Sequence, residues 1–401
     1  MRGWPTVTDT AGRPLGSGRG PGASATGDGL IRRRRRRRLR NSALGAAVLL
    51  LAAAGAGWAG YARLSANITP DEAAAAELAR YERERPTALV RDAQNILLIG
   101  SDTRAGEANS AYGKGVRGQR SDTTILLHLA ADRTSATAVS LPRDLMVDVP
   151  SCRQEDGTRS DPVFAMFNHA FEVGGSACTI RTVEKLTGIR VDHHMVLDFA
   201  GFKEIVDAVD GVEVCLDAPV DDKAAKLRLP AGRVTLNGEQ ALGYVRARKS
   251  LGNGSDTERM KRQQRFLGAL VDKVRDDDIL LNPVKLYPLL DAATSALTTD
   301  PELASLRGLY RLARGLRDIP TEQVRFLTVP RRSYVYDANR DQLVEPDAEK
   351  LFGRLRADQP VTVTPENSQE VPRDVTGAGG PDGPSPAPTF HGYTAAEHTC
   401  A

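Results

Sequence analysis

The stretch Asn-Ile-Leu-Leu-Ile-Gly-Ser-Asp-Thr-Arg, residues 95–104, decides the fold class, because a short apolar run passes directly into a polar cluster. Apolar runs of about four to eight residues bounded by turn residues are typical of strands buried in a sheet. The same pattern predicts further strands at 124–129, 136–141, 212–216 and 324–329.

Helical patterns lie between these predicted strands, at 164–173, 178–186, 199–207, 238–245, 257–274, 284–290 and 301–316. Strands that alternate with helices indicate an α/β sheet with helices packed on its faces. We therefore expect one α/β domain over residues 93–364. The Pro-, Gly- and Ser-rich residues 365–401 are expected to form a disordered tail.

Polar residues gather where the predicted strands begin and end. Asp102 and Arg104 follow the first strand, Arg120 and Asp122 precede the second, and Arg143 follows the third. In α/β sheets, groups at such positions converge on one crevice. Two carboxylates together with phosphate oxygens are a typical Mg²⁺ site, and arginines bind phosphate through two parallel hydrogen bonds. The alternative interpretation makes each aspartate an ordinary turn or cap residue.

A second polar concentration surrounds the predicted helix 257–274. Arg246 and Arg248 are two residues apart, so on an extended segment they lie on one side. Arg259, Arg262 and Gln263 share one face of the first two helical turns. These residues predict an anion site, in which arginines and helix N–H groups bind phosphate. The alternative is a solvated basic face.

The charge of the chain is unevenly distributed. The 401 residues carry a formal net charge of +3. Residues 1–40 hold 11 Arg and two acids, a net of +9, so the rest of the chain carries −6. A mildly acidic folded part argues against general nucleic-acid binding, and no nucleic-acid partner is expected.

The uncharged residues 43–62 follow the run of seven arginines at 32–38. Residues 41–64 are long enough to cross a bilayer as one helix, and the basic run would keep the N-terminus in the cytoplasm. The alternative is a cleaved signal peptide. We thus expect a disordered, basic cytoplasmic segment at 1–40, a transmembrane helix at 41–64 and an exported remainder. Residues 65–92 are expected to form a helical stalk or, alternatively, the first helix of the domain.

The four cysteines contain no CxxC pair, which makes a zinc ribbon a poor interpretation. Cys152 and Cys178 are better explained as a disulfide of an exported domain than as catalytic thiols, with Cys215 as the alternative partner. The spacing of Phe164, Phe167 and Phe171 predicts that all three lie in the core. The pair His193–His194 is interpreted as structural rather than metal-binding.

Eight segments in order resemble the LytR-CpsA-Psr family of Gram-positive cell-envelope proteins. They are NILLIGSDTR (95–104), RSDTTILLHL (120–129), VSLPRDLMVDVP (139–150), FNHAFEVGG (167–175), TVEKLTGI (182–189), the long segment 191–216, LPAGRVTLNGEQALGYVRARK (229–249) and SDTERMKRQQRFL (255–267). The resemblance is strongest over residues 93–275. It implies a three-layer α/β/α sandwich with an apolar pocket for a polyprenyl chain, outside a single N-terminal transmembrane helix.

The resemblance also implies an activity: a Mg²⁺-dependent phosphotransferase that moves a glycopolymer from a polyprenyl-pyrophosphate carrier to peptidoglycan. The expected location is the cell membrane, with the catalytic domain extracellular. Asp102 and Asp122 match the Mg²⁺-binding acids. The positions that match pyrophosphate and head-group contacts are Arg120, Arg143, Arg246, Arg248, Arg259 and Gln263. The residues expected to act in catalysis are Asp122, Arg143, Arg246 and Arg248.

Two alternatives belong to other classes of protein. One is a non-catalytic protein that binds polyprenyl phosphates through the same pocket. The other is a membrane-bound transcriptional attenuator, which conflicts with an exported, acidic domain because DNA binding would rest on the arginine run alone.

Overall fold

The computed structural model describes residues 27–101, 121–223, 225–247, 251, 256–276, 279, 282–365 and 388–398. The chain divides into two compact units, residues 1–61 and 62–401. Helix α1 (Gly27–Asn67) contains a segment, Leu39–Asn67, that is long and apolar enough to cross a membrane. The helix begins at Gly27, inside the segment that was expected to be disordered.

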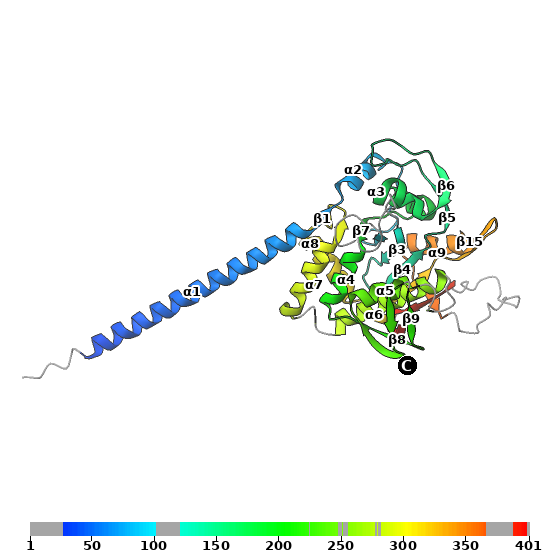
Figure 1. Ribbon diagram of the computed structural model, residues 1–401. Helices are drawn as coiled ribbons and strands as arrows, with labels where there is room; N and C mark the ends of the chain where they lie inside the picture. Colours follow the sequence, from blue (N-terminus) through cyan, green and yellow to red (C-terminus); the bar gives the residue numbers. More distant parts are fainter. Residues whose placement is uncertain are drawn as a thin grey trace, which may run out of the picture. The chain divides into compact units, whose positions relative to one another are not determined.

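A nine-stranded mixed sheet forms the centre of the second unit (Figure 1). Its strand order is β1-β12-β7-β2-β3-β4-β13-β17-β16. The strands are β1 (Thr69–Pro70), β2 (Gln94–Ser101), β3 (Ser121–Leu129), β4 (Ala136–Leu141), β7 (His193–Leu197), β12 (Leu297–Thr299), β13 (Val324–Thr328), β16 (Thr362–Thr364) and β17 (Thr389–Thr394). Strands β2, β3 and β4 run antiparallel to one another, whereas β7 runs parallel to β2 and β13 parallel to β4.

Helices cover both faces of this sheet. Successive side chains of a strand point to opposite faces, so each face of the sheet contributes to a core of its own. Leu97 and Ile99 of β2 belong to a core shared with α2, α3 and α9, whereas Ile96 belongs to one that packs against α6 and α8. The helices are α2 (Glu72–Arg80), α3 (Asn168–Thr187), α4 (Phe199–Ala208), α5 (Gly238–Arg246), α6 (Asp256–Asp276), α7 (Pro283–Ala296), α8 (Leu306–Arg317) and α9 (Asp347–Arg356). The predicted α/β/α sandwich is confirmed.

The described residues also form four two-stranded elements outside this sheet. Strands β5 (Met146–Val149) and β6 (Val163–Met166) pair, as do β8 (Val212–Leu216) with β11 (Gly232–Leu236). The other two are β9 (Val220–Asp222) with β10 (Leu227–Leu229), and β14 (Arg331–Tyr334) with β15 (Asp337–Leu343). Short 3₁₀ turns follow at Thr321–Gln323 and Ala395–His398.

The expected stalk is instead part of the domain. Ala74 and Leu78 of α2 are buried in the core that α2 shares with α3. The segment joins the sheet as well, since β1 pairs with β12. Helix α2 was predicted over a longer range, but it is only nine residues long. The alternative, a first helix of the domain, is therefore the correct description.

Asp71 ties this first helix to the sheet. Its side chain caps α2 by accepting a hydrogen bond from the Ala74 amide, and it also accepts from Ser176 and contacts His194 Nε2 at 3.2 Å. Burial alone would raise the pKa of this carboxyl, but hydrogen bonds with His194 and Ser176 lower it to about 2. His193 also contacts a carboxylate, with its Nδ1 3.2 Å from Asp300 Oδ1. Both histidines therefore join parts of the fold, which agrees with the prediction that they are structural.

Replacement of Asp71 should therefore destabilise the domain. Asp71→Ala removes a helix cap and leaves two buried partners without an acceptor, and we expect a loss of about 2–3 kcal/mol in unfolding free energy. Because the pKa in the folded state is depressed, the contribution is present above the ordinary pKa of 3.8 and is lost as the pH falls toward 2. Urea unfolding at pH 7 and at pH 3 checks both statements, and equal stability of the two proteins at pH 7 would contradict them.

The segment predicted as a helix over 164–173 divides into a strand and a helix. Phe167 and Phe171 are buried as expected, but Phe164 lies on β6 and is 50% exposed. Helical spacing of three phenylalanines was misleading here, because β5 supplies antiparallel partners for residues 163–166.

The disulfide Cys152–Cys178 is confirmed, with the two Cα atoms 5.5 Å apart. Cys215 is disulfide-bonded as well and so is not the partner of Cys152. Helix α3 is interrupted at Gly174 and Gly175, just before Cys178. A Cβ on Gly174 would lie 2.8 Å from the Arg153 carbonyl oxygen and 2.9 Å from the Cys178 Cβ, so the glycine lets the cross-linked segments approach closely.

The expectation of a disordered tail from residue 365 is wrong for part of it. Strand β17 lies inside the sheet, antiparallel to β13 and parallel to β16. Phe390 is buried in the main core, and the Tyr393 hydroxyl donates to the Lys261 carbonyl oxygen at 3.2 Å.

Candidate active site

Four strand ends meet at one edge of the sheet. Ser101, the last residue of β2, pairs with Ser121, the first of β3, and Leu141 at the end of β4 pairs with Thr124. Leu197 at the end of β7 pairs with Gly100. The residues that follow β4 and β7 therefore lie beside the start of β3, as the convergence argument predicted.

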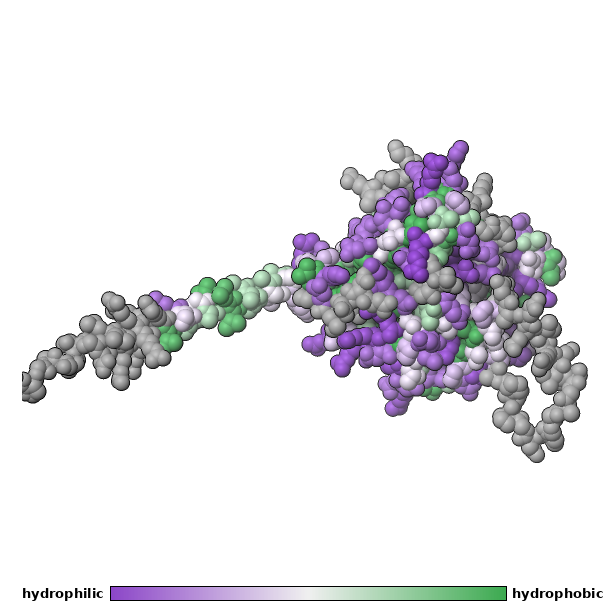
Figure 2. All heavy atoms as spheres, turned by 90° about the horizontal axis from the view of Figure 1, so that it is seen from below, coloured by the Kyte–Doolittle hydropathy of each residue, from purple (hydrophilic) through white to green (hydrophobic). Residues whose placement is uncertain are grey.

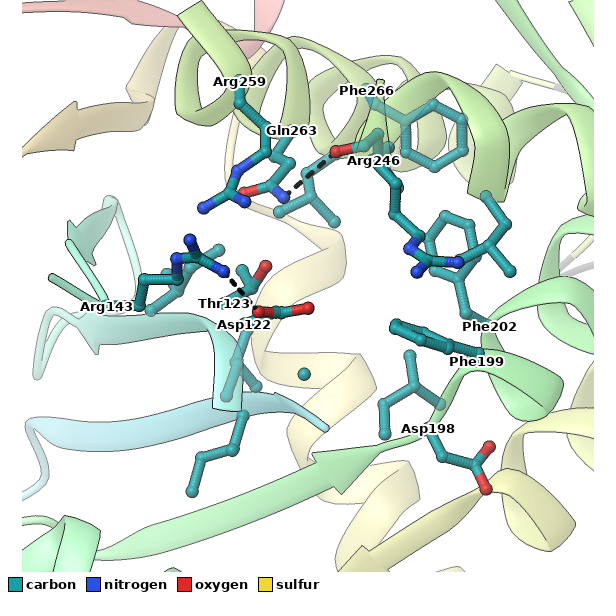
Figure 3. A pocket seen from close by; sticks show the side chains of 18 of the residues that line it. Asp122, Thr123, Arg143, Asp198, Phe199, Phe202, Arg246, Arg259, Gln263 and Phe266 are labelled. Carbon is teal, nitrogen blue, oxygen red and sulfur yellow. Dashed lines mark hydrogen bonds and ion pairs between the residues drawn. The ribbon is translucent and has the colours of Figure 1, made fainter. Parts of the chain in front are cut away.

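A cavity of about 670 Å³ opens at this edge. Part of its wall is apolar and comes from the sheet and from α4 and α6: Leu98, Ile125, Met195, Phe202, Phe266 and Leu267. The rest is charged or polar and includes Asp122, Arg143, Asp144, Arg246, Arg259 and Gln263. Figure 3 shows Arg143, Arg246, Arg259 and Gln263 around one open space with Asp122. One cavity thus combines an apolar wall with a cluster of cations.

Arg143 is held between two carboxylates. Its guanidinium donates to Asp122 Oδ1 at 3.0 Å and to Asp144 Oδ2 at 3.3 Å. Burial alone would lower the pKa of Arg143, but the carboxylates of Asp144 and Asp122 raise it above its ordinary value. Arg143 therefore stays protonated, and its orientation is fixed before any ligand arrives.

Arg246 lies on the other side of the cavity, in the last turn of α5. Helix α5 begins with a capping box in which Asn237 and Gln240 each accept a hydrogen bond from the backbone N–H of the other. The Arg246 guanidinium carbon lies 4.4 Å from the centre of the Phe199 ring, which supports the planar group by a cation–π contact. Its planar group thus lies within the cavity (Figure 3).

Helix α6 contributes Arg259 and Gln263 from its first two turns. Arg259 is 5% exposed and forms an ion pair with Asp256, with nitrogen and oxygen 2.6 Å apart. Gln263 donates to the Val245 carbonyl oxygen at 3.2 Å, which links α6 to the end of α5. Both residues line the cavity.

Arg262 has a different role from its two neighbours. Its guanidinium donates to the carbonyl oxygens of Tyr244, Ala247 and Leu251, so it holds the chain that leaves α5. The prediction that Arg262 shares an anion-binding face with Arg259 and Gln263 is wrong, because these carbonyl oxygens occupy its donors. The spacing of residues along a helix does not show which arginine side chains already donate to backbone carbonyl oxygens.

Four of the predicted site residues, Asp102, Arg104, Arg120 and Arg248, lie outside the described residues. Among the other residues that line the cavity, Asp144, Asn168 and Phe199 are examples that were not predicted as site residues. Asp144 directly follows Arg143 behind a predicted strand, so adjacency to a strand end was an available signal for this residue. The ring of Phe199 under Arg246 had no such signal, because that contact joins the start of α4 to the end of α5.

The charged part of the cavity has the chemistry of a phosphate site that could accept Mg²⁺. Asp122 points into the cavity and presents a carboxylate, the ligand type that Mg²⁺ takes together with phosphate oxygens. Within the described residues no group of three acidic, histidine or cysteine side chains forms a complete metal cage. One or two carboxylates completed by a phosphorylated ligand fit this donor set.

An apolar pocket with an arginine-rich end, on an α/β/α sandwich, offers complementary surroundings to a ligand that is apolar at one end and anionic at the other. The LytR_cpsA_psr family model matches residues 64–357, and the chain belongs to this family.

Two curated relatives from Corynebacterium glutamicum are similar in sequence. A probable cell wall biosynthesis protein, LcpB, is 36% identical over 65% of this chain and 61% of its own length. The cell wall biosynthesis protein LcpA is 34% identical over 59% of this chain and 50% of its own length. The chain thus spans about half to three fifths of these relatives. In Enterococcus faecalis, the polyisoprenyl-teichoic acid–peptidoglycan teichoic acid transferase TagU is 33% identical over 55% of this chain and 67% of its own length.

Solved structures share the fold. A LytR-Csp2A-Psr enzyme from Actinomyces oris superposes with a TM-score of 0.54 at 21% identity, covering 68% of this chain and 93% of its own. TagV from B. subtilis gives a TM-score of 0.52 at 23% identity, covering 67% of this chain and 98% of its own.

Proposed function

We propose that this protein transfers a glycopolymer from a polyprenyl-pyrophosphate carrier to peptidoglycan, with formation of a phosphodiester bond. The proposal depends on one observation: an apolar wall and a group of polar side chains line the same cavity. The polar side chains are those of Arg143, Arg246, Arg259 and Gln263. A polyprenyl pyrophosphate is apolar at one end and doubly charged at the other, so both parts of this ligand find complementary surroundings. Transferase names among the family relatives support the same reaction class.

The arginines would bind and orient the pyrophosphate. Arg143 is already fixed by Asp122 and Asp144, and Arg246 is supported by Phe199, so little side-chain order is lost when the ligand binds. Planar guanidinium groups match the spacing of phosphate oxygens and can bind them through two hydrogen bonds each. Arg120 and Arg248 are proposed to add to this set.

In the proposed reaction, a muramic acid hydroxyl oxygen attacks the phosphorus that carries the glycopolymer. A new P–O bond forms, the bridging P–O bond of the pyrophosphate breaks, and polyprenyl phosphate leaves with the bond's electron pair. The hydroxyl proton is released to water. Negative charge grows on the leaving phosphate, where Arg143 and Arg246 would stabilise it. Asp122 with Asp102 would hold Mg²⁺, which supplies further charge neutralisation when bound.

The proposed location is the cell membrane, with α1 as the anchor and the second unit outside the cell. The disulfide Cys152–Cys178 supports this orientation, because such bonds persist in oxidising compartments. Peptidoglycan, the proposed acceptor, also lies outside the membrane.

Neutral residues in place of Arg32–Arg38 should scramble the orientation, since cytoplasmic positive charge near a span directs its insertion. Protease digestion of intact cells, followed by detection of the C-terminal part, measures the orientation. Replacement of the same seven residues by lysine keeps the charge and should preserve it. If the neutral variant keeps its domain outside in every molecule, the arginine run does not set the orientation.

The decisive test of the activity is a transfer assay with the purified full chain, a defined lipid-linked glycan and peptidoglycan fragments. We expect a phosphodiester-linked product that disappears when Mg²⁺ is chelated and returns when it is restored. Asp122→Ala should lose activity and Mg²⁺ dependence together. Tight binding of the lipid-linked glycan without product would instead establish a non-catalytic carrier-binding protein.

A further inference from the structure

Two hairpins form an exposed apolar patch outside the cavity. Hairpin β5–β6 contributes Phe164, and hairpin β14–β15 contributes Tyr334, Val335 and Tyr336; we call these four residues the hairpin patch. Phe164 is 50%, Val335 68% and Tyr336 85% exposed. The rings contact one another, with centroids 6.1 Å apart for Phe164 and Tyr334 and 5.4 Å apart for Tyr334 and Tyr336. Three neighbouring aromatic rings at a surface indicate a binding function.

The hairpin patch lies close to the part of the cavity wall that contains Met166 and Asp144. On β6, Phe164 lies two residues before the cavity residue Met166, a separation of about 7 Å along a strand. The base of β14–β15 is attached to the cavity wall, because the Asp341 amide donates to the Asp144 carbonyl oxygen at 3.1 Å. Arg331 at the same base contacts Asp341 and Thr257. The two hairpins of the patch are thus attached to the cavity wall at Met166 and Asp144.

The two hairpins that form the patch also contain positively and negatively charged side chains. Asp148 pairs with Phe164 across β5–β6, and Asp337 forms an ion pair with Arg340, with nitrogen and oxygen 2.9 Å apart. Arg332 on β14 and Asn339 on β15 are exposed as well. Two acids and two arginines do not select a polyanion, whereas carboxylates, guanidinium groups and an amide all offer hydrogen bonds to hydroxyls.

We propose that the hairpin patch binds the saccharide strand of the peptidoglycan acceptor. This inference rests on the proposed function. A pyranose ring has one face of C–H groups that carries slight positive charge, which suits the negative face of an aromatic ring, and hydroxyls at its edge that need polar partners. The donor is held by its prenyl chain and pyrophosphate inside the cavity, whereas the acceptor has no such anchors. An acceptor surface beside the phosphate end would place its hydroxyl for attack.

The test measures binding of uncrosslinked glycan strands, released from peptidoglycan by an amidase, to the purified full chain. Phe164→Ala with Tyr336→Ala should weaken binding roughly tenfold or more, as loss of aromatic anchors does at interfaces. Tyr336→Trp should retain binding and Tyr336→Leu should not, because leucine is apolar but has no ring. The matched control is Tyr310→Ala: Tyr310 is 63% exposed but lies on α8, outside the patch. Unchanged thermal melting shows that each variant folds.

Transfer kinetics separate this inference from the proposed function. In the double variant the KM for the acceptor should rise while the KM for the lipid-linked donor stays unchanged. If transfer proceeds but strand binding and acceptor KM equal those of the wild type, the acceptor surface is elsewhere. If the donor KM rises instead, or if the patch variants lose binding to lipid vesicles but not to strands, the inference is overturned. Failure of the wild type to transfer at all would refute the proposed function itself.

Discussion

Arg246→Ala is expected to reduce glycopolymer transfer by roughly two to three orders of magnitude, the usual effect of removing one donor that stabilises charge in a transition state. The domain should still fold, because the guanidinium lies in the cavity over Phe199 and not in the core. Arg246→Lys should also transfer poorly, since an ammonium keeps the charge but cannot form two parallel hydrogen bonds. The turnover number and thermal melting of each variant measure these effects.

Arg143→Ala should have a similar effect on transfer, with one addition. The substitution leaves the carboxylates of Asp122 and Asp144 without their shared cation, so it should also change the Mg²⁺ concentration needed for activity. The control is Arg311→Ala, because Arg311 is exposed on α8 and far from the matched segments in sequence. Normal transfer by Arg246→Ala and Arg143→Ala, or unfolding of either variant, would show that the site is assigned wrongly.

The second large effect concerns stability. Replacing both Cys152 and Cys178 by alanine should destabilise the domain by about 3 kcal/mol, because the cross-link closes a loop with a sequence separation of 26 residues. The melting temperature should fall by several degrees as a result. Changing both residues avoids a lone thiol that could exchange with Cys215, which is itself disulfide-bonded.

Peptide mapping without reductant provides the control for that experiment. The peptides with Cys152 and Cys178 should be joined in the wild type, and the state of Cys215 should be the same in the wild type and the double variant. A melting temperature equal to that of the wild type would mean that packing around α3, and not the cross-link, holds the loop.

The sequence predicted four of the nine strands of the central sheet, β2, β3, β4 and β13, because burial on both faces leaves a short, largely apolar run. The strand predicted at 212–216 is β8, which pairs with β11 outside this sheet. Strand β4 is buried at all of its residues, and its predicted and observed limits coincide. Polar residues that follow such runs were predicted to converge, and the structure brings Asp122 and Arg143 together.

Features that depend on partners distant in the chain were not predictable. Phe164 fits a helical stripe, yet pairing with Asp148 makes it part of a strand. Arg262 has the same spacing as a ligand-binding residue, yet carbonyl oxygens at the end of α5 take its donors. Strand β17 follows a Pro- and Gly-rich segment and contains Gly392, which is a poor strand former by itself. A Cβ at Gly392 would lie 2.4 Å from the Phe326 carbonyl oxygen, so close strand contact requires the glycine.

Strand β17 also determines where the protein can be shortened. A chain cut after Pro365 would appear to lose only a low-complexity tail, but it would lose the strand between β13 and β16. The freed edge of β13 would then present unpaired N–H and C=O groups, and Phe326, which is buried in the intact chain, would lose the ring of Tyr393 that stacks on it. Such an edge is a template for pairing with a second molecule. Self-association of such a shortened protein would therefore be a product of the cut and not a property of the intact domain.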